Sequence, residues 1–182
     1  KERGLKGVSV ADMMGAAGLT HGGFYGHFES KDALAGAAAA GAFEQSTQRW
    51  RRRVGAAPDA AAGRAAIVDS FLSPRSVREV GLGCPAVSMA SDVAREPAGA
   101  AIRGPFIDGL EGLVRILADV QDGPDASARR AAALADYATL AGALLLARAT
   151  EGSALSTDLL AAARDRLLGA PAPRTPVKTR AA

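Results

Sequence analysis

The chain has 182 residues, with 22 lysines and arginines against 19 aspartates and glutamates, so its formal net charge is +3. That length suffices for one large domain or two small ones with a buried core. It contains 43 alanines, whereas aromatic residues make up only 4% of the chain. This composition favours helix and argues against a β-sandwich or a barrel. A single cysteine excludes an intramolecular disulfide framework and a multi-cysteine zinc site.

The positive charge is concentrated at the C-terminus. A proline-rich tail, residues 170–182, holds three basic residues and no acid, which leaves 19 basic and 19 acidic residues in the rest of the chain. Binding of nucleic acid regardless of its sequence scales with the phosphates neutralised, so any such contact must be local. We expect the basic tail to be disordered. The longest uncharged apolar stretch, residues 137–147, is shorter than the ~20 residues that span a bilayer. With no signal-peptide pattern at the start, we expect a cytoplasmic protein with no membrane partner.

Capping residues and Gly or Pro stop signals divide the chain into helices, and no segment shows sustained alternation typical of a strand. The sequence therefore predicts an all-α fold. Residues 74–84, which include Gly81 and Gly83, are expected to form a loop or a broken turn. The expected helices span residues 10–17, 21–28, 30–54, about 59–72, 85–94, 97–122, 125–150, and from 156 or 157 to 168.

Residues 9–34 read SVADMMGAAGLTHGGFYGHFESKDAL. Two short helices separated by a glycine turn have the spacing of a helix-turn-helix, and Gly18 suits the left-handed backbone of that turn. Gly22, Gly23 and Gly26 would each cost about 1 kcal/mol relative to alanine in an exposed helix. Such a helix is a poor structural choice unless its surface must come very close to something. A helix that enters a major groove has that requirement, while the polar side chains beside the glycines reach phosphates or base edges.

These residues resemble the DNA-binding motif of TetR-type transcriptional regulators, with Ala-Gly-Leu-Thr, Phe-Tyr-x-His-Phe and Ser-Lys-Asp-Ala-Leu in order. The resemblance implies that the following residues mainly hold phosphates: Ser9, Thr20, Tyr25, His27 and Lys31. It further implies that His21, Gly22 and Gly23 face the bases. In that family a helix precedes the motif, and the opening Lys-Glu-Arg-Gly-Leu-Lys-Gly is similar to the end of that helix, so most of it is expected to be missing here.

The rest of the chain also resembles that family, through GCPAVSMASDVAR at 83–95, FIDGLEGLVRIL and AGALLLARAT. The resemblance implies a DNA-binding domain with its connecting helix over residues 1–48 and an effector-binding, dimerising bundle over 55–169. Aromatic and Met residues at helical spacing are more often core than pocket, so the sequence does not separate the two. The candidate pocket residues are Trp50, Phe71, Cys84, Met89, Phe106, Leu110, Tyr137 and Leu140.

The last two expected helices are the candidates for a dimer interface. The helix around 134–149 is apolar nearly all round and must be covered, within the chain or between chains. The resemblance favours a four-helix interface made by this pair from each subunit. The interface candidates are Leu134, Ala138, Ala141, Leu145, Leu159, Leu160, Ala163 and Leu167.

Together these features predict a homodimeric, ligand-responsive repressor that a small effector, apolar or amphipathic, releases from a palindromic double-stranded DNA operator. The alternative is a redox or electrophile sensor acting through Cys84, if Arg75 and Arg78 lower the pKa of its thiol. We expect no cofactor and no metal, since His21 and His27 lie six residues apart and cannot share an ion on one helix face. An enzyme has little support, because no catalytic constellation can be nominated. The arginines at 49 and 51–53 are expected to be a solvated helix C-terminus.

Overall fold

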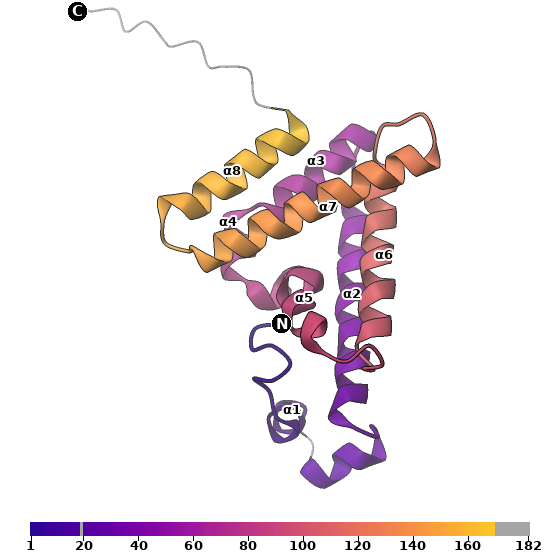
Figure 1. The fold of residues 1–182 in the computed structure, drawn as a ribbon, viewed down its shortest axis with the longest axis vertical. Coiled ribbons are helices and arrows are strands. Elements are labelled where there is room, and N and C mark those ends of the chain that lie inside the picture. Colours follow the sequence, from indigo (N-terminus) through magenta and orange to yellow (C-terminus); the bar gives the residue numbers. More distant parts are fainter. Residues whose placement is uncertain (19, 170–182) are drawn as a thin grey trace, which may run out of the picture.

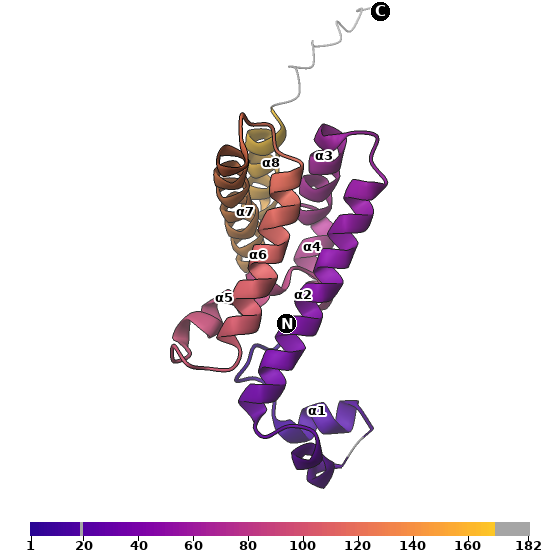
Figure 2. The same cartoon turned by 90° about the vertical axis from the view of Figure 1, so that its right-hand side faces the viewer.

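The computed structural model describes residues 1–18 and 20–169, and the predicted basic tail at 170–182 lies outside that range. The described part consists of helices joined by turns (Figure 1). One long helix, α2 (Lys31–Gly55), runs nearly the length of the molecule. The helix α1 (Val10–Ala16) and the 3₁₀ helix η1 (His21–Gly26) lie at its N-terminal end, and the bundle packs against one side of its other half (Figure 2).

The bundle is built from six further α-helices and one short 3₁₀ turn. Helix α6 lies along α2, and α7 and α8 form an antiparallel pair across the top of the molecule (Figure 1). The elements are α3 (Ala60–Phe71), α4 (Pro74–Arg78), η2 (Val80–Leu82), α5 (Pro85–Arg95), α6 (Arg103–Asp119), α7 (Ala126–Ala149) and α8 (Ala154–Leu168).

Most predicted helix starts are confirmed by their caps. Ser9 and Asp12 form a reciprocal capping box on α1, and the side chains of Ser30, Asp59 and Asp125 each accept a bond from a backbone N–H in the first turn of their helix.

Three predicted elements are corrected. Residues 21–28 form a six-residue 3₁₀ turn instead of a longer α-helix, because three glycines lower the helical propensity. Part of 74–84 is helical, since Ser73 caps α4 and Pro74 occupies its first position. Helix α6 begins at Arg103, not at residue 97, because the Arg103 guanidinium bonds the backbone carbonyls of Glu96 and Pro97 and holds the preceding loop.

The predicted cap of the last helix is also corrected. Helix α8 begins after Ser153, three residues before the predicted cap at Ser156. Ser156 is buried instead, and its hydroxyl donates to the carbonyl oxygen of Ala147 at 2.7 Å. That bond joins the start of α8 to the end of α7.

The core lies between α2, α6 and α7. Phe43 of α2 is 2% exposed and meets Phe106 of α6 edge-on, with ring centroids 5.4 Å apart. Gly109 lets the two helices approach closely, because a Cβ at this position would overlap the Phe43 ring. A continuous apolar core thus fixes the distal half of α2 to α6.

Helix α7 is the one described helix that is long and apolar enough to cross a membrane by length and composition. A core helix passes the same test, and α7 packs against α5, α6 and α8. Its Asp136 accepts bonds from Arg64 at 2.6 Å and from Gln121 at 2.6 Å within the protein. These contacts fix one face of α7 to the bundle.

Candidate DNA-binding unit and effector cavity

The turn between α1 and η1 contains the predicted left-handed glycine. Gly18 has a φ of +69°, the left-handed conformation that glycine adopts without strain. Thr20 then caps η1, because its hydroxyl oxygen accepts a bond from the backbone N–H of Gly23 at 3.3 Å. Met14 of α1 and Phe24 of η1 are buried, at 5% and 1% exposure, so each of the two elements has one buried apolar side chain.

All five residues predicted to contact phosphates are exposed. Four of them lie after this turn or at the start of α2, namely Thr20, Tyr25, His27 and Lys31. Tyr25 is 69% exposed although its neighbour Phe24 is buried. The fifth, Ser9, is also exposed, but its hydroxyl donates to Asp12 at 2.7 Å and serves the cap of α1.

The predicted base-facing residues are described in part. The side chain of His21 and the surroundings of Gly22 lie outside what the structure describes. At Gly23 an added Cβ would lie 3.6 Å from the Thr20 hydroxyl oxygen, an ordinary contact, and at Gly26 it would meet nothing within 4 Å. The fold of this unit therefore has room for a side chain at both positions.

Three hydrogen bonds involving backbone groups join the N-terminal unit (residues 1–29) and the start of α2 to the bundle, and sequence reasoning missed all three. The Lys1 ammonium donates to the Gly83 carbonyl at 3.5 Å. The carboxylate of Asp32, at the start of α2, accepts a bond from the N–H of Ala101 at 2.8 Å. Four residues on, a Cβ at Gly36 would lie 2.8 Å from the Ala101 carbonyl oxygen. The N–H of Leu5 donates to Asp92 of α5 at 2.8 Å. The loop before α6 and helix α5 thus hold the unit in place.

A cavity of about 260 Å³ lies beside the distal half of α2. Helix α2 contributes Ser46, Arg49, Trp50 and Arg53. The end of α3 and the segment after it contribute Ser70, Phe71, Ser73, Arg75, Ser76 and Glu79. The wall is completed by Leu82, Gly83, Cys84, Leu113 and Leu144.

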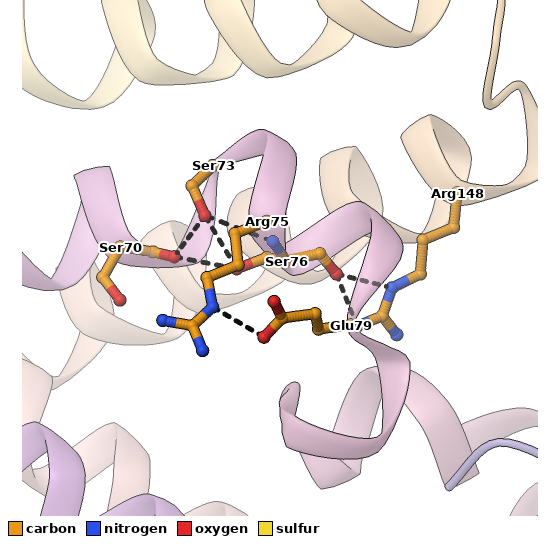
Figure 3. Close-up of polar contacts among 6 residues, drawn as sticks. All are labelled: Ser70, Ser73, Arg75, Ser76, Glu79 and Arg148. Carbon is orange, nitrogen blue, oxygen red and sulfur yellow. Dashed lines mark hydrogen bonds and ion pairs between the residues drawn. The ribbon is translucent and has the colours of Figure 1, made fainter.

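Hydrogen bonds and one ion pair connect polar residues at the rim of this cavity (Figure 3). The carbonyl oxygen of Ser70 accepts bonds from the hydroxyls of Ser73 at 3.0 Å and Ser76 at 2.8 Å. Arg75 pairs with Glu79 at 2.6 Å, and the Arg148 guanidinium of α7 donates to the Ser76 carbonyl at 2.9 Å. The rim therefore connects α3, α4 and α7.

The structure brings three of the eight predicted pocket residues to this cavity: Trp50, Phe71 and Cys84. Tyr137 lies directly behind them, with its ring centroid 6.0 Å from Trp50 and 6.3 Å from Phe71. The other four are packed in the core and do not line the cavity, namely Met89, Phe106, Leu110 and Leu140. The helical spacing of these four residues therefore reflects core packing, which is the more common reason for such spacing than a ligand pocket.

The prediction of a solvated arginine cluster is wrong for two of its four members. Arg49 and Arg53 are half-buried and line the cavity, whereas Arg51 and Arg52 are exposed. A usable signal was present in the sequence. Ser46, Arg49, Trp50 and Arg53 share one face of a helix at spacings of three and four residues, and the single tryptophan indicates that this face is buried.

Cys84 is buried, and its sulfur lies 3.0 Å from the Tyr137 hydroxyl. Burial raises the pKa of the Cys84 thiol, although the Tyr137 hydrogen bond and the nearby Arg148 oppose that shift. Burial also raises the pKa of Tyr137 well above its ordinary value. The cations that interact electrostatically with Cys84 are thus Arg148, Arg49 and Lys1, in place of the expected Arg75 and Arg78. A buried thiol of raised pKa is poorly suited to react as a thiolate.

A second hollow, of about 600 Å³, lies between α4 and the start of α8. Much of its wall is exposed on the surface, including Arg78, Glu151 and Thr157. It has no aromatic lining, unlike the cavity beside α2. The smaller cavity among the core helices is therefore the better candidate for a small-molecule site.

An apolar stripe on α7 and α8 is exposed. Leu145 is 51% exposed, Leu134 46% and Leu155 of α8 54%. Leu155 was not among the predicted interface residues. Of those besides Leu134 and Leu145, Ala138 is exposed, and Ala141 and Leu159 are half-buried. Leu160, Ala163 and Leu167 are buried within the chain and offer no surface to a partner. The face that needs covering therefore lies mainly on α7 and the first half of α8.

Comparison with known proteins agrees with this geometry. Residues 1–38 match the model of the family described as bacterial regulatory proteins, tetR family. No curated protein matches the sequence. The fold is similar to that of E. coli NemR in its reduced form, with a TM-score of 0.69 at 18% identity, over 94% of this chain and 91% of that one.

A second similar structure is the transcriptional regulator FadR from Bacillus subtilis in complex with stearoyl-CoA, with a TM-score of 0.65 at 15% identity. The likeness covers 93% of this chain and 92% of that one. At these identities the two structures establish the fold alone. The family match covers residues 1–38, so this N-terminal segment is similar to the DNA-binding part of bacterial regulatory proteins of the tetR family.

Proposed function

We propose that the protein is a homodimeric repressor that binds a palindromic DNA operator through residues 20–31 and leaves it when a small effector occupies the cavity beside α2. The cytoplasm is the expected compartment, since the operator is genomic DNA. The observation that carries the proposal is the construction of η1. Gly23 and Gly26 leave room that the fold itself does not use, beside the exposed side chains of Thr20, Tyr25, His27 and Lys31.

Lys31 and the start of α2 support a phosphate contact. Lys31 is the first residue of a 25-residue helix capped by Ser30, and its side chain is exposed. A cation is disfavoured at a helix N-terminus by the helix dipole, and a bound phosphate removes that penalty. The ammonium and the free backbone N–H groups would then act on one anion.

The exposed apolar stripe on α7 and α8 supports a dimer. Three leucines about half-exposed on one helix pair, Leu134, Leu145 and Leu155, are an unusual surface for a monomer. A second copy that covers the stripe would form an isologous four-helix interface. Such a dimer carries two copies of η1, which an operator of two inverted half-sites would match.

The cavity supports control by a small molecule more than by thiol chemistry. It opens against α2, the helix that begins at the DNA-binding unit, so an occupant has a direct mechanical route to that unit. Cys84 borders the same space, but burial raises the pKa of its thiol. We therefore place ligand binding first and the Cys84 sensor second.

The test is selection of DNA from a random library with the purified protein. We expect an inverted repeat with half-sites about one helical turn apart. Lys31→Gln should weaken binding to all sequences and lower the slope of log affinity against log salt by about one. Arg51→Gln removes an exposed charge near the distal end of α2 and is the control. It should change neither the DNA affinity nor the salt slope. Equal effects of the two variants, or no enriched repeat, would refute the proposal.

A further inference from the structure

We propose that the cavity beside α2 binds a small organic anion, with its carboxylate or phosphate group at Arg49 and Arg53 and its apolar body against Trp50 and Phe71. This deepens the proposed function by giving the chemical class of the effector. Only the expectation that the bound anion releases DNA rests on that function. The cavity, the two arginines and the aromatic wall carry it.

The two arginines are cations without a matching acid. Across the described residues, neither Arg49 nor Arg53 takes part in an ion pair, and the one carboxylate on the cavity wall, that of Glu79, is already paired with Arg75. Arg49 donates instead to the hydroxyl of Ser46 at 2.7 Å, a neutral acceptor. The wall therefore carries an excess of positive charge that an anion would neutralise.

The arrangement has a cost that an anion would remove. Arg49 and Arg53 lie four residues apart on one helix face, where like charges repel. Burial lowers the pKa of the Arg53 guanidinium, and the charges of Arg49 and Arg52 lower it further. Burial likewise lowers the pKa of Arg49. Two partly desolvated guanidiniums present planar donors that match a carboxylate or a phosphate.

Stabilisation of the helix end does not account for both residues. Helix α2 ends at Gly55, and the favourable effect of a cation on a helix C-terminus falls off within the last turn. Arg52 and Arg53 lie in that turn, and Arg52 fulfils the role from the exposed side. Arg49 lies before the turn and faces inward, so its position follows from the cavity and not from the dipole.

The apolar part of the cavity wall determines what the rest of the ligand can be. Trp50 and Phe71 are 7% and 6% exposed, with ring centroids 6.1 Å apart, and Leu113 and Leu144 extend the apolar surface. The volume of about 260 Å³ falls just below the ~300 Å³ at which typical ligand sites begin. The occupant is therefore a compact molecule with one anionic end and one ring or short alkyl group.

The single tryptophan makes the site directly observable. Trp50 lines the cavity, so its fluorescence reports occupancy without interference from another tryptophan. We would titrate the full chain, at constant ionic strength, with phenylacetate, phenyl phosphate and the neutral phenylacetamide. Both anions should bind at least tenfold more tightly than the amide, since charge-assisted bonds are worth that much. A preference between the two anions then decides between a carboxylate and a phosphate.

Arg49→Gln and Arg53→Gln should each reduce anion affinity at least tenfold and leave amide affinity unchanged. Arg52→Gln is the matched control, because it removes the same charge from the exposed side of the same helix turn. An equal loss in Arg52→Gln, equal binding of amide and anions, or no saturable fluorescence change at millimolar concentration would overturn the proposal. If circular dichroism shows that a glutamine variant has lost helix content, the proposal is decided by the affinities of the unsubstituted protein for the amide and for the two anions.

The same titration repeated with operator DNA separates this proposal from the proposed function. Saturable anion binding that leaves DNA affinity unchanged would keep the anion site and refute effector release. Release of DNA by neutral compounds, with no anion bound at Trp50, would refute the anion site and keep the regulator.

Discussion

The N-terminal unit and the bundle differ in how much core holds each of them. Among the described residues before Ser30, only Met14 and Phe24 are buried apolar side chains. The bundle contains a continuous core in which Ile67, Leu113 and Leu140 have no exposed surface. The unit therefore has little core of its own, while the bundle resists deformation. The position of the N-terminal unit is therefore set by α2 and by its hydrogen bonds to the bundle more than by its own packing.

The largest expected effect comes from damage to the bundle alone. Gly109→Ala would place a Cβ inside the Phe43 ring, and α6 cannot move away without separating from α2. We expect the free energy of unfolding to fall by about 3 kcal/mol, at the upper end for overpacking. Gly104→Ala on the same helix, where an added Cβ meets nothing within 4 Å, should be neutral or slightly stabilising. Urea unfolding of both measures the difference, and equal stabilities would contradict the close α2–α6 packing.

The next effect separates subunit assembly from the fold of one chain. Leu145→Arg places a charge in the exposed stripe of α7 and should change the stability of the protomer little, since Leu145 is 51% exposed. If the stripe is the dimer interface, the variant becomes monomeric in sedimentation and loses about 100-fold in operator affinity, because only one half-site is then bound at a time. Ile107→Arg, which is 61% exposed on α6, is the control. A dimeric Leu145→Arg would remove the interface from this face.

The two regions also differ in how far the sequence predicted them. In the N-terminal unit, the positive φ of Gly18 and the caps at Ser9, Thr20 and Ser30 are local consequences of residue type, so they were predictable. In the bundle, helix existence was predictable for the same reason. The inward faces of Arg49 and Arg53 and the contact between Asp32 and Ala101 were missed, because they depend on which helices meet. Periodicity marks a buried face but does not say whether that face meets a core or a cavity.

A smaller effect tests the connection between unit and bundle. Gly36→Ala would place a Cβ 2.8 Å from the Ala101 carbonyl oxygen and push the loop before α6 away from α2. We expect stability to fall by about 1 kcal/mol and operator affinity to change by about fivefold, a coupling of ordinary size. Gly41→Ala, on the same helix with nothing within 4 Å, should alter neither. Hydrogen exchange should be faster at residues 96–102 in the first variant only, and unchanged exchange there would mean that this contact does not hold the unit.

The smallest effect is an alkaline sensitivity of the bundle. Burial raises the pKa of Cys84 in the folded protein above its ordinary value of 9.0, so the folded state holds this proton more tightly than the unfolded chain does. Its contribution to stability is complete below pH 9 and is lost as the pH rises above that value. Urea unfolding between pH 7.5 and pH 10 should show a steeper loss of stability for the parent than for Cys84→Ala. Part of the loss remains in the variant, because burial also raises the pKa of Tyr137. Parallel curves for the two proteins would mean that water reaches Cys84 in the folded protein and that its thiol ionises at its ordinary pKa. A reactive thiolate would then be available, as the thiol-sensing alternative requires.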